Sequence, residues 1–114
     1  MKFQDRELDF DVFDVEVAER YEAALRGVEE RNRVRPKGES LSGTIRRQCG
    51  DVFNFFDDLF GEGFHKELFG DKTNLVTCLD VFAAFQEAVA AQKQAIDQRL
   101  AKYSPDRAER GAKK

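Results

Sequence analysis

The stretch that decides the fold runs from Leu41 to Phe60 and has the sequence LSGTIRRQCGDVFNFFDDLF. Its apolar residues recur every three or four positions, which is the spacing of one face of an α-helix. That face consists of Ile45, Cys49, Val52, Phe53, Phe56 and Phe60, and it is widened by Leu41, Phe55 and Leu59. The apolar arc then spans about 160° of the helix, whereas a helix that faces a single core needs about 100°.

Two interpretations of this wide arc are open. In the first, the helix is central and packs against other elements on several sides, so that the whole arc is buried. In the second, the edge of the arc around Phe55 and Leu59 is exposed and binds a partner, because a large apolar surface patch commonly marks an interaction site. On the second interpretation, we predict that Phe55 and Leu59 are partner-binding residues.

Two further long helices and one short helix are predicted around this stretch. Residues 15–34 carry an apolar stripe at helical spacing, with Asp14 as a candidate N-cap, and Pro36 disfavours any continuation. Residues 75–103 carry a second, longer stripe. Residues 62–69 are predicted to form a short helical turn, because a glycine stands directly before and directly after them.

The N-terminal residues 1–13 predict a β element. Leu8, Phe10 and Val12 alternate with acidic residues, and a period of two is typical of a strand with one buried face. Phe3 is placed on the other arm of a short hairpin. Since an isolated hairpin is only marginally stable, this element must pack on the helices or pair with another chain.

Together these elements predict a mainly α fold in a single domain of residues 1–103, with a three-helix core and a short N-terminal β-hairpin or strand. The helix at 75–103 is about 43 Å long, whereas the other two long helices reach about 28 Å. Its end, with Ile96, Leu100 and Tyr103, should therefore extend beyond the other helices. This end needs cover from the N-terminal element or from a second copy, and we predict a homodimer.

Composition excludes several classes of function. The net charge is −3, so the chain has no basic field with which to hold nucleic acid. No apolar run approaches the roughly 20 residues that span a bilayer, and the first residues lack the apolar core of a signal peptide. We therefore expect a cytoplasmic protein that binds neither nucleic acid nor membrane.

The reactive side chains follow no pattern of a catalytic or metal site. Cys49 and Cys78 fit no metal-binding or redox spacing and are predicted to be reduced core thiols. His65, the single histidine, is predicted to lie exposed on a turn. A cation site at Asp9, Asp11 and Asp14 is disfavoured, because the segment lacks the glycine turn and distal glutamate of a calcium loop. We therefore predict no enzymatic activity, no cofactor and no bound metal.

Residues 104–114 are predicted to form a disordered, moderately basic tail. This tail is either a solvated terminus or a docking peptide for an acidic surface. In the second case Arg107 and Arg110 are candidate contacts.

The segment from Tyr103 to Arg110, YSPDRAER, resembles the ending of small Firmicutes prophage proteins of the tail-assembly-chaperone type. Further segments that resemble this family include LDFDVFD, IRRQC, VFNFFD and LFG, so the resemblance covers nearly the whole chain. Asp106 stands where the family ending has Asn, and Gly111 stands where it has Arg. The resemblance implies a protein that binds the long, apolar tape measure protein before the tail tube forms around it, with the tail tube protein as a second partner.

A small acidic regulatory module, such as an antitoxin or an anti-repressor, is the alternative function. A regulator that acts by mimicry needs a concentrated acidic face. Here residues 31–50, with six basic side chains and one acidic side chain, interrupt the acidic blocks. We therefore expect a phage tail assembly chaperone, and the alternative stays open.

Overall fold

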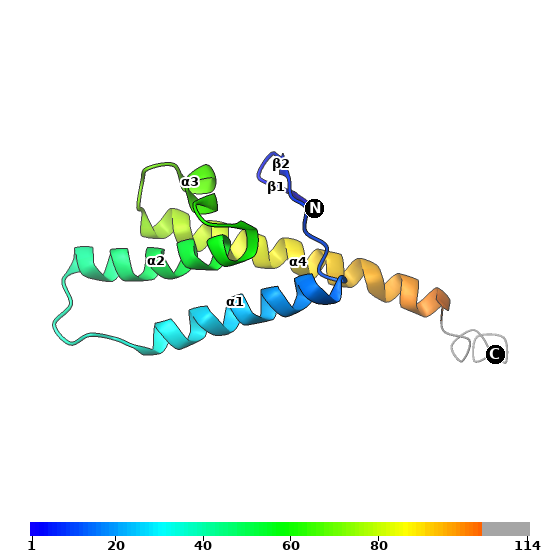
Figure 1. Ribbon diagram of the computed structural model, residues 1–114, viewed down its shortest axis with the longest axis horizontal. Coiled ribbons are helices and arrows are strands. Elements are labelled where there is room, and N and C mark those ends of the chain that lie inside the picture. The colour runs from blue at the N-terminus through cyan, green and yellow to red at the C-terminus, as the bar shows by residue number, and fades with distance from the viewer. Residues whose placement is uncertain (104–114) are drawn as a thin grey trace.

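The computed structural model describes residues 1–103. It is mainly helical, as predicted, with a small N-terminal hairpin (Figure 1). The elements are β1 (Lys2–Phe3), β2 (Arg6–Glu7), α1 (Val15–Arg33), α2 (Leu41–Phe60), α3 (Phe64–Phe69) and α4 (Leu75–Tyr103). The predicted tail at 104–114 lies outside the described residues. The bounds of α2 and α4 agree with the prediction, and α1 is one residue shorter than predicted.

Helix α2 is the central element of the fold. It packs against α1, α3 and α4, and Figure 1 shows it between α1 and α4. Its N-cap is Ser40, whose hydroxyl accepts a hydrogen bond from Gly43 N at 3.1 Å. The helix ends at Gly61, where φ is +111°, a value that residues with a Cβ rarely adopt.

The core is built largely from aromatic rings around Phe85 of α4. This ring lies within 5.3–6.3 Å, centroid to centroid, of six other rings. They belong to Phe3, Phe10, Tyr21, Phe55, Phe56 and Phe60. Edge-to-face pairs of this kind contribute about 0.5–1.5 kcal/mol each beyond their buried area. One side chain of α4 therefore joins the N-terminal residues, α1 and α2.

The N-terminal β element is shorter than predicted. Lys2 pairs with Glu7 and Phe3 with Arg6, across a two-residue turn whose φ values are positive. Residues 8–13 form no strand, which corrects the prediction of a strand there. Their alternation is nevertheless real, because Leu8, Phe10 and Val12 are buried and the acidic residues between them are exposed.

A side chain takes the place of the missing neighbouring strand. Gln92 Oε1 accepts a hydrogen bond from Val12 N at 3.4 Å, and Gln92 Nε2 donates one to the Phe10 carbonyl at 3.3 Å. The extended segment therefore has backbone partners without a sheet. The pattern of the sequence does not reveal this partner, because Gln92 is a polar residue that lies 80 positions from Val12 along the chain.

Helix α1 begins after Asp14, as predicted, but the Asp14 carboxylate accepts no hydrogen bond from the α1 backbone. Its predicted stripe faces the core: Tyr21 and Ala24 are buried, and Val17, Leu25 and Val28 pack against the core.

Helix α4 is long and apolar enough to cross a membrane by length and composition, with a mean hydropathy of 1.3 over an 18-residue window. Core helices of soluble proteins pass the same test, and α4 buries Cys78, Val81, Phe85 and Val89 against the rest of the fold. Of that window 22% is buried within the fold, so this packing accounts for only part of the apolar character of α4. That the protein binds no membrane stays a prediction.

Candidate protein-binding surfaces

The predicted binding edge of α2 is buried, so this prediction is wrong. Phe55 is 0% exposed and its ring packs edge-on against the rings of Tyr21 and Phe82, at centroid distances of 6.1 and 4.9 Å. Leu59 is 4% exposed. The reason is that α1 and α4 flank α2 on different sides and cover this edge of the apolar arc, whereas Leu41 at the start of the arc is 79% exposed. Phe55 and Leu59 are core residues, as the first interpretation of the wide arc expects.

The predicted extension of α4 beyond its neighbours is confirmed. Figure 1 shows its last turns projecting past α1 and α2. Ile96 is half-buried, Leu100 is 55% exposed and Tyr103 is 83% exposed. We call these three residues the overhang. Arg107 and Arg110, the other predicted contacts, lie outside the described residues.

A cavity of about 320 Å³ lies at the base of the overhang. Its lining comes from the N-terminal residues and from the C-terminal half of α4, namely Met1, Phe10, Asp11, Phe13, Gln92, Ala95, Ile96 and Arg99. The N-terminal residues therefore cover the start of the overhang and leave its last turns exposed.

A second hollow, of about 270 Å³, lies toward the other end of the molecule. Helices α1 and α4 approach each other where the Tyr21 and Phe85 rings meet, and Figure 1 shows them diverging from there on either side of α2. The hollow is lined by Val28 and Asn32 of α1, Gln48, Asp51 and Val52 of α2, and Leu79 and Phe82 of α4. We call these seven residues the α1–α4 groove.

The α1–α4 groove combines four apolar lining residues with two amides, Asn32 and Gln48, and one carboxylate, Asp51. Leu79 is 47% exposed, so the wall on α4 presents aliphatic surface to a ligand. Asp51 is buried and lies 3.4 Å from Arg31 Nε. The two side chains form no hydrogen bond, and Arg31 Nε has no hydrogen-bond partner among residues 1–103. The buried groups without a hydrogen-bond partner at this position are therefore guanidinium donors of Arg31, and the Asp51 carboxylate is already ion-paired.

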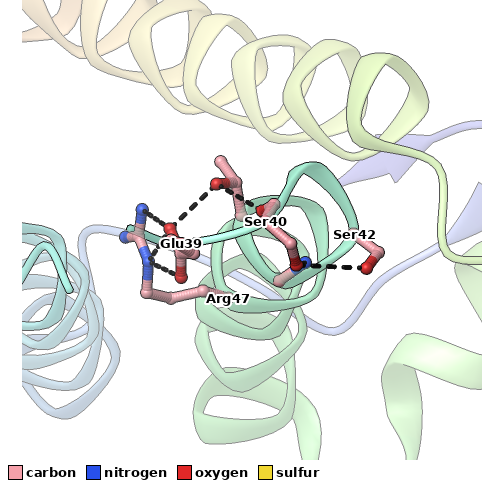
Figure 2. Close-up of polar contacts among 6 residues, drawn as sticks. Glu39, Ser40, Ser42 and Arg47 are labelled. Atoms are coloured by element: carbon pink, nitrogen blue, oxygen red, sulfur yellow. Dashed lines mark hydrogen bonds and ion pairs between the residues drawn. The ribbon is translucent and has the colours of Figure 1, made fainter. Parts of the chain in front are cut away.

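The connection between α1 and α2 is fastened to α2 by a polar network (Figure 2). Arg47 donates from Nε and Nη2 to the Glu39 carboxylate at 3.0–3.2 Å, and Thr44 Oγ1 donates to the same group at 2.9 Å. These bonds, that from Arg47 above all, hold the pKa of Glu39 below its ordinary value. The network holds Glu39, the residue before the α2 N-cap, against the first two turns of α2.

His65 is half-buried and paired, which corrects the prediction of an exposed histidine. Its ring stacks on Phe53 with centroids 4.6 Å apart, and its Nδ1 lies 2.9 Å from Asp57 Oδ2. Asp57 Oδ1 also accepts a hydrogen bond from His65 N at 2.9 Å. Burial acts to raise the pKa of Asp57, but hydrogen bonds from His65 and Gly63 outweigh it and lower the pKa. The pair fastens α3 to α2.

The two cysteines are free and buried in the core. Cys49 lies on α2 and Cys78 on α4, and the two thiols are hydrogen-bonded to each other. Burial, together with this hydrogen bond, raises the pKa of Cys78 to about 12. In residues 1–103, no cluster of three or more His, Cys, Asp or Glu side chains is placed to hold a metal ion.

The position of Leu79 is a signal in the sequence for the α1–α4 groove. Leu79 lies in the helix predicted at residues 75–103. At 100° per residue it lies about 115° from the centre of the stripe formed by Cys78, Val81, Phe85 and Val89. An apolar residue so far from the buried face of its helix is a candidate for contact with a binding partner. The other groove residues are contributed by three helices, and no single stripe reveals how they are combined.

Residues 4–114 match the model of a family of unknown function, DUF6673. Neither the curated proteins nor the solved structures give a match. Because the match spans almost the entire chain, the protein belongs to the DUF6673 family.

Proposed function

We propose that this protein is a tail assembly chaperone of a phage or prophage, and that it holds an apolar helical segment of a tape measure protein in the α1–α4 groove. The observation that carries the proposal is the groove itself, an exposed apolar hollow between two helices that diverge over a third. A fourth helix laid there would complete a helical bundle.

The lining of the groove suits one face of an amphipathic helix. Lining residues on the same helix are spaced one turn apart, as in Val28 with Asn32 and Gln48 with Val52. A bound helix presents apolar anchors at i, i+3, i+4 and i+7, which match this spacing.

The choice of client rests on the resemblance of the sequence to tail assembly chaperones. A tape measure protein is a long, apolar, helical chain that aggregates unless a partner covers it before the tube assembles. A groove that binds short helical stripes, one at a time, fits that task. The tail tube protein is a second partner implied by the same resemblance.

Co-expression of the protein with a tape measure protein tests the proposal. Leu79→Asp should weaken client binding about tenfold, because it removes the apolar area that this half-exposed leucine would bury against the client and places a carboxylate there instead. Leu41→Asp is the matched control, since Leu41 is exposed and lies outside the groove. For each variant, the amount of soluble client and the amount of client recovered in a pull-down are measured, together with the melting temperature of the variant. Equal client recovery with both variants would exclude the groove as the binding site.

A further inference from the structure

We propose that two copies of the protein pair through the ends of their α4 helices, and that Tyr103 of each copy enters the cavity at the base of the other copy's overhang. We call this cavity, of about 320 Å³, the N-terminal cavity. The assembly is a closed two-fold dimer, and its surfaces are separate from the α1–α4 groove, which lies toward the other end of the molecule.

The overhang continues the side of α4 that faces the core. Phe85 is buried, and Gln92 bonds to the backbone of the N-terminal residues. Ile96, Leu100 and Tyr103 follow at the same spacing of three or four residues, so they lie on the same face of the helix. Residues 1–103 leave Leu100 and Tyr103 largely uncovered. A stripe that faces the core therefore runs past the end of the fold that covers it.

The spacing of the overhang is self-complementary. Ile96 and Tyr103 are equally far from the midpoint between Arg99 and Leu100. Two antiparallel α4 ends that meet at this midpoint place Ile96 of each copy opposite Tyr103 of the other. The two Leu100 side chains then lie next to the axis. A two-fold dimer requires a surface that pairs with itself in this way.

The N-terminal cavity lies where Tyr103 of the second copy arrives, because Ile96 is one of its lining residues. Phe13 and Asp11 also line it, and Phe13 is 45% exposed. Cavities of about 300 Å³ and more hold small ligands, so there is room for one aromatic side chain. Asp11 Oδ1 accepts a hydrogen bond from Phe13 N at 3.0 Å, which holds the carboxylate in place. The Phe13 ring and the Asp11 carboxylate therefore offer a tyrosine one apolar contact and one acceptor for its hydroxyl.

The charges on the two sides of this contact are opposite. Residues 8–16 carry four exposed acidic side chains and no basic one, whereas residues 93–103 carry three basic side chains and one acidic. The antiparallel arrangement brings the basic end of each α4 toward the acidic segment of the other copy. Arg99, next to the axis, lines the same cavity as Asp11, so a carboxylate lies near this charge as well. Complementary charges of this kind favour one orientation of the two copies.

The exposed apolar area at this end suits a weak dimer. An aromatic side chain buries about 150–250 Å², so Phe13, Leu100 and Tyr103 together expose roughly 400 Å² in each copy. With the polar side chains around them, two copies would bury roughly 1,000 Å² in total, which is the lower end of the range for specific interfaces. We therefore expect a dissociation constant on the order of tens of micromolar.

Sedimentation velocity from about 5 to about 200 µM tests the dimer, since this range spans the expected affinity. The wild-type chain should pass from monomer to dimer and form nothing larger. Leu100→Asp should stay monomeric, because it places two carboxylates side by side at the axis. Tyr103→Ala should weaken the dimer at least about tenfold, because the N-terminal cavity is then left empty. Thermal melts at the lowest concentration show whether each variant is folded.

Three results would overturn the proposal. The first is a wild-type chain that stays monomeric over the whole range. The second is a wild-type chain that continues to larger assemblies, because a two-fold contact closes at two copies. The third is a folded Leu100→Asp or Tyr103→Ala chain that dimerises as the wild type does.

Engineered cysteines test the two-fold geometry. Leu100→Cys places one thiol of each copy next to the axis, so oxidised glutathione should link two copies by a disulfide. Val76→Cys is the matched control, since Val76 is exposed near the other end of α4 and should give no linked dimer. The native Cys49 and Cys78 are buried in both variants. Equal linking of the two variants on a non-reducing gel would contradict the antiparallel pairing.

The variants also separate the dimer from the proposed function. Leu79→Asp changes the α1–α4 groove and leaves the α4 end intact, so it should dimerise as the wild type does. Leu100→Asp leaves the groove intact and should still bind a tape measure segment. If Leu79→Asp loses the client but still dimerises, the two surfaces are independent, as proposed. If Leu79→Asp is folded and monomeric, the copies associate through the groove and the α4 ends are not the interface.

Discussion

Arg31 of α1 and Asp51 of α2 form an ion pair, with 3.4 Å between Arg31 Nε and Asp51 Oδ1, beneath the groove that we propose as the binding site. Removal of one partner from a buried pair leaves the other charge without compensation. Arg31 retains some exposure, so water lessens that cost.

We predict that Asp51→Ala lowers the free energy of unfolding by about 1–3 kcal/mol. The double substitution Arg31→Met with Asp51→Leu should recover most of this loss, because an apolar pair of similar volume often replaces a buried ion pair without destabilisation. Urea unfolding of both single variants and the double variant measures the coupling. A double variant less stable than either single variant would show that the pair is a net source of stability.

Substitution of Phe85, the central ring of the aromatic core, should have a large effect on the stability of the fold. Phe85→Ala should lower the free energy of unfolding by about 3–5 kcal/mol, because it removes the ring that six others contact and leaves a cavity. Tyr103→Ala, at the exposed end of the same helix, should change it by less than about 0.5 kcal/mol. Thermal denaturation of the two variants followed by circular dichroism makes the comparison, and similar melts would contradict the assigned core.

Phe55→Asp tests the corrected position of the α2 edge. A carboxylate at a position with 0% exposure is buried without a partner, so this variant should fail to fold. Leu100→Asp introduces the same group at an exposed apolar position and should melt like the wild type. A folded Phe55→Asp protein would return this edge to consideration as a binding surface.

The Asp57 pair predicts a dependence of stability on pH. The pKa of Asp57 is lowered in the folded chain, so below about pH 4 the unfolded chain binds the proton more readily than the folded chain. The contribution of the Asp57 carboxylate should be complete above that pH and disappear as the pH falls through the folded pKa. Asp57→Asn should cost about 1 kcal/mol at pH 7, as expected for loss of a charge-assisted hydrogen bond, and less at pH 2. A cost independent of pH would mean that the hydrogen bonds survive without the charge.

The cysteines should be unreactive in the folded protein. With its pKa raised to about 12, Cys78 remains a thiol at pH 8, and both side chains are buried. Alkylation with iodoacetamide should therefore label neither cysteine in the native state and both in urea, as counted by mass spectrometry. Rapid labelling of Cys78 in the native protein would show that α2 and α4 separate locally.

The sequence predicts the helices well because their stripes are continuous and their ends carry clear signals. Residues 41–60 and 75–103 are examples, each with a regular apolar spacing. The candidate site is different. A helical wheel shows that the arc of α2 is wide, but it does not show how many neighbours cover the arc, so Phe55 was open to either interpretation. A groove such as that formed by Val28, Val52 and Leu79 depends on the angle at which helices diverge, which is a tertiary property.

The hydrogen bonds of Gln92 to the backbone at Phe10 and Val12 have a consequence for biosynthesis. The extended segment leaves the ribosome long before the residue that pairs its backbone, and Phe85, against which the Phe10 ring packs, also emerges late. A nascent chain that ends before α4 therefore exposes Phe10 and cannot close the core. Contacts so distant in sequence slow folding, so the final step should follow completion of α4, and ribosome-bound chains shorter than about 90 residues should remain sensitive to protease.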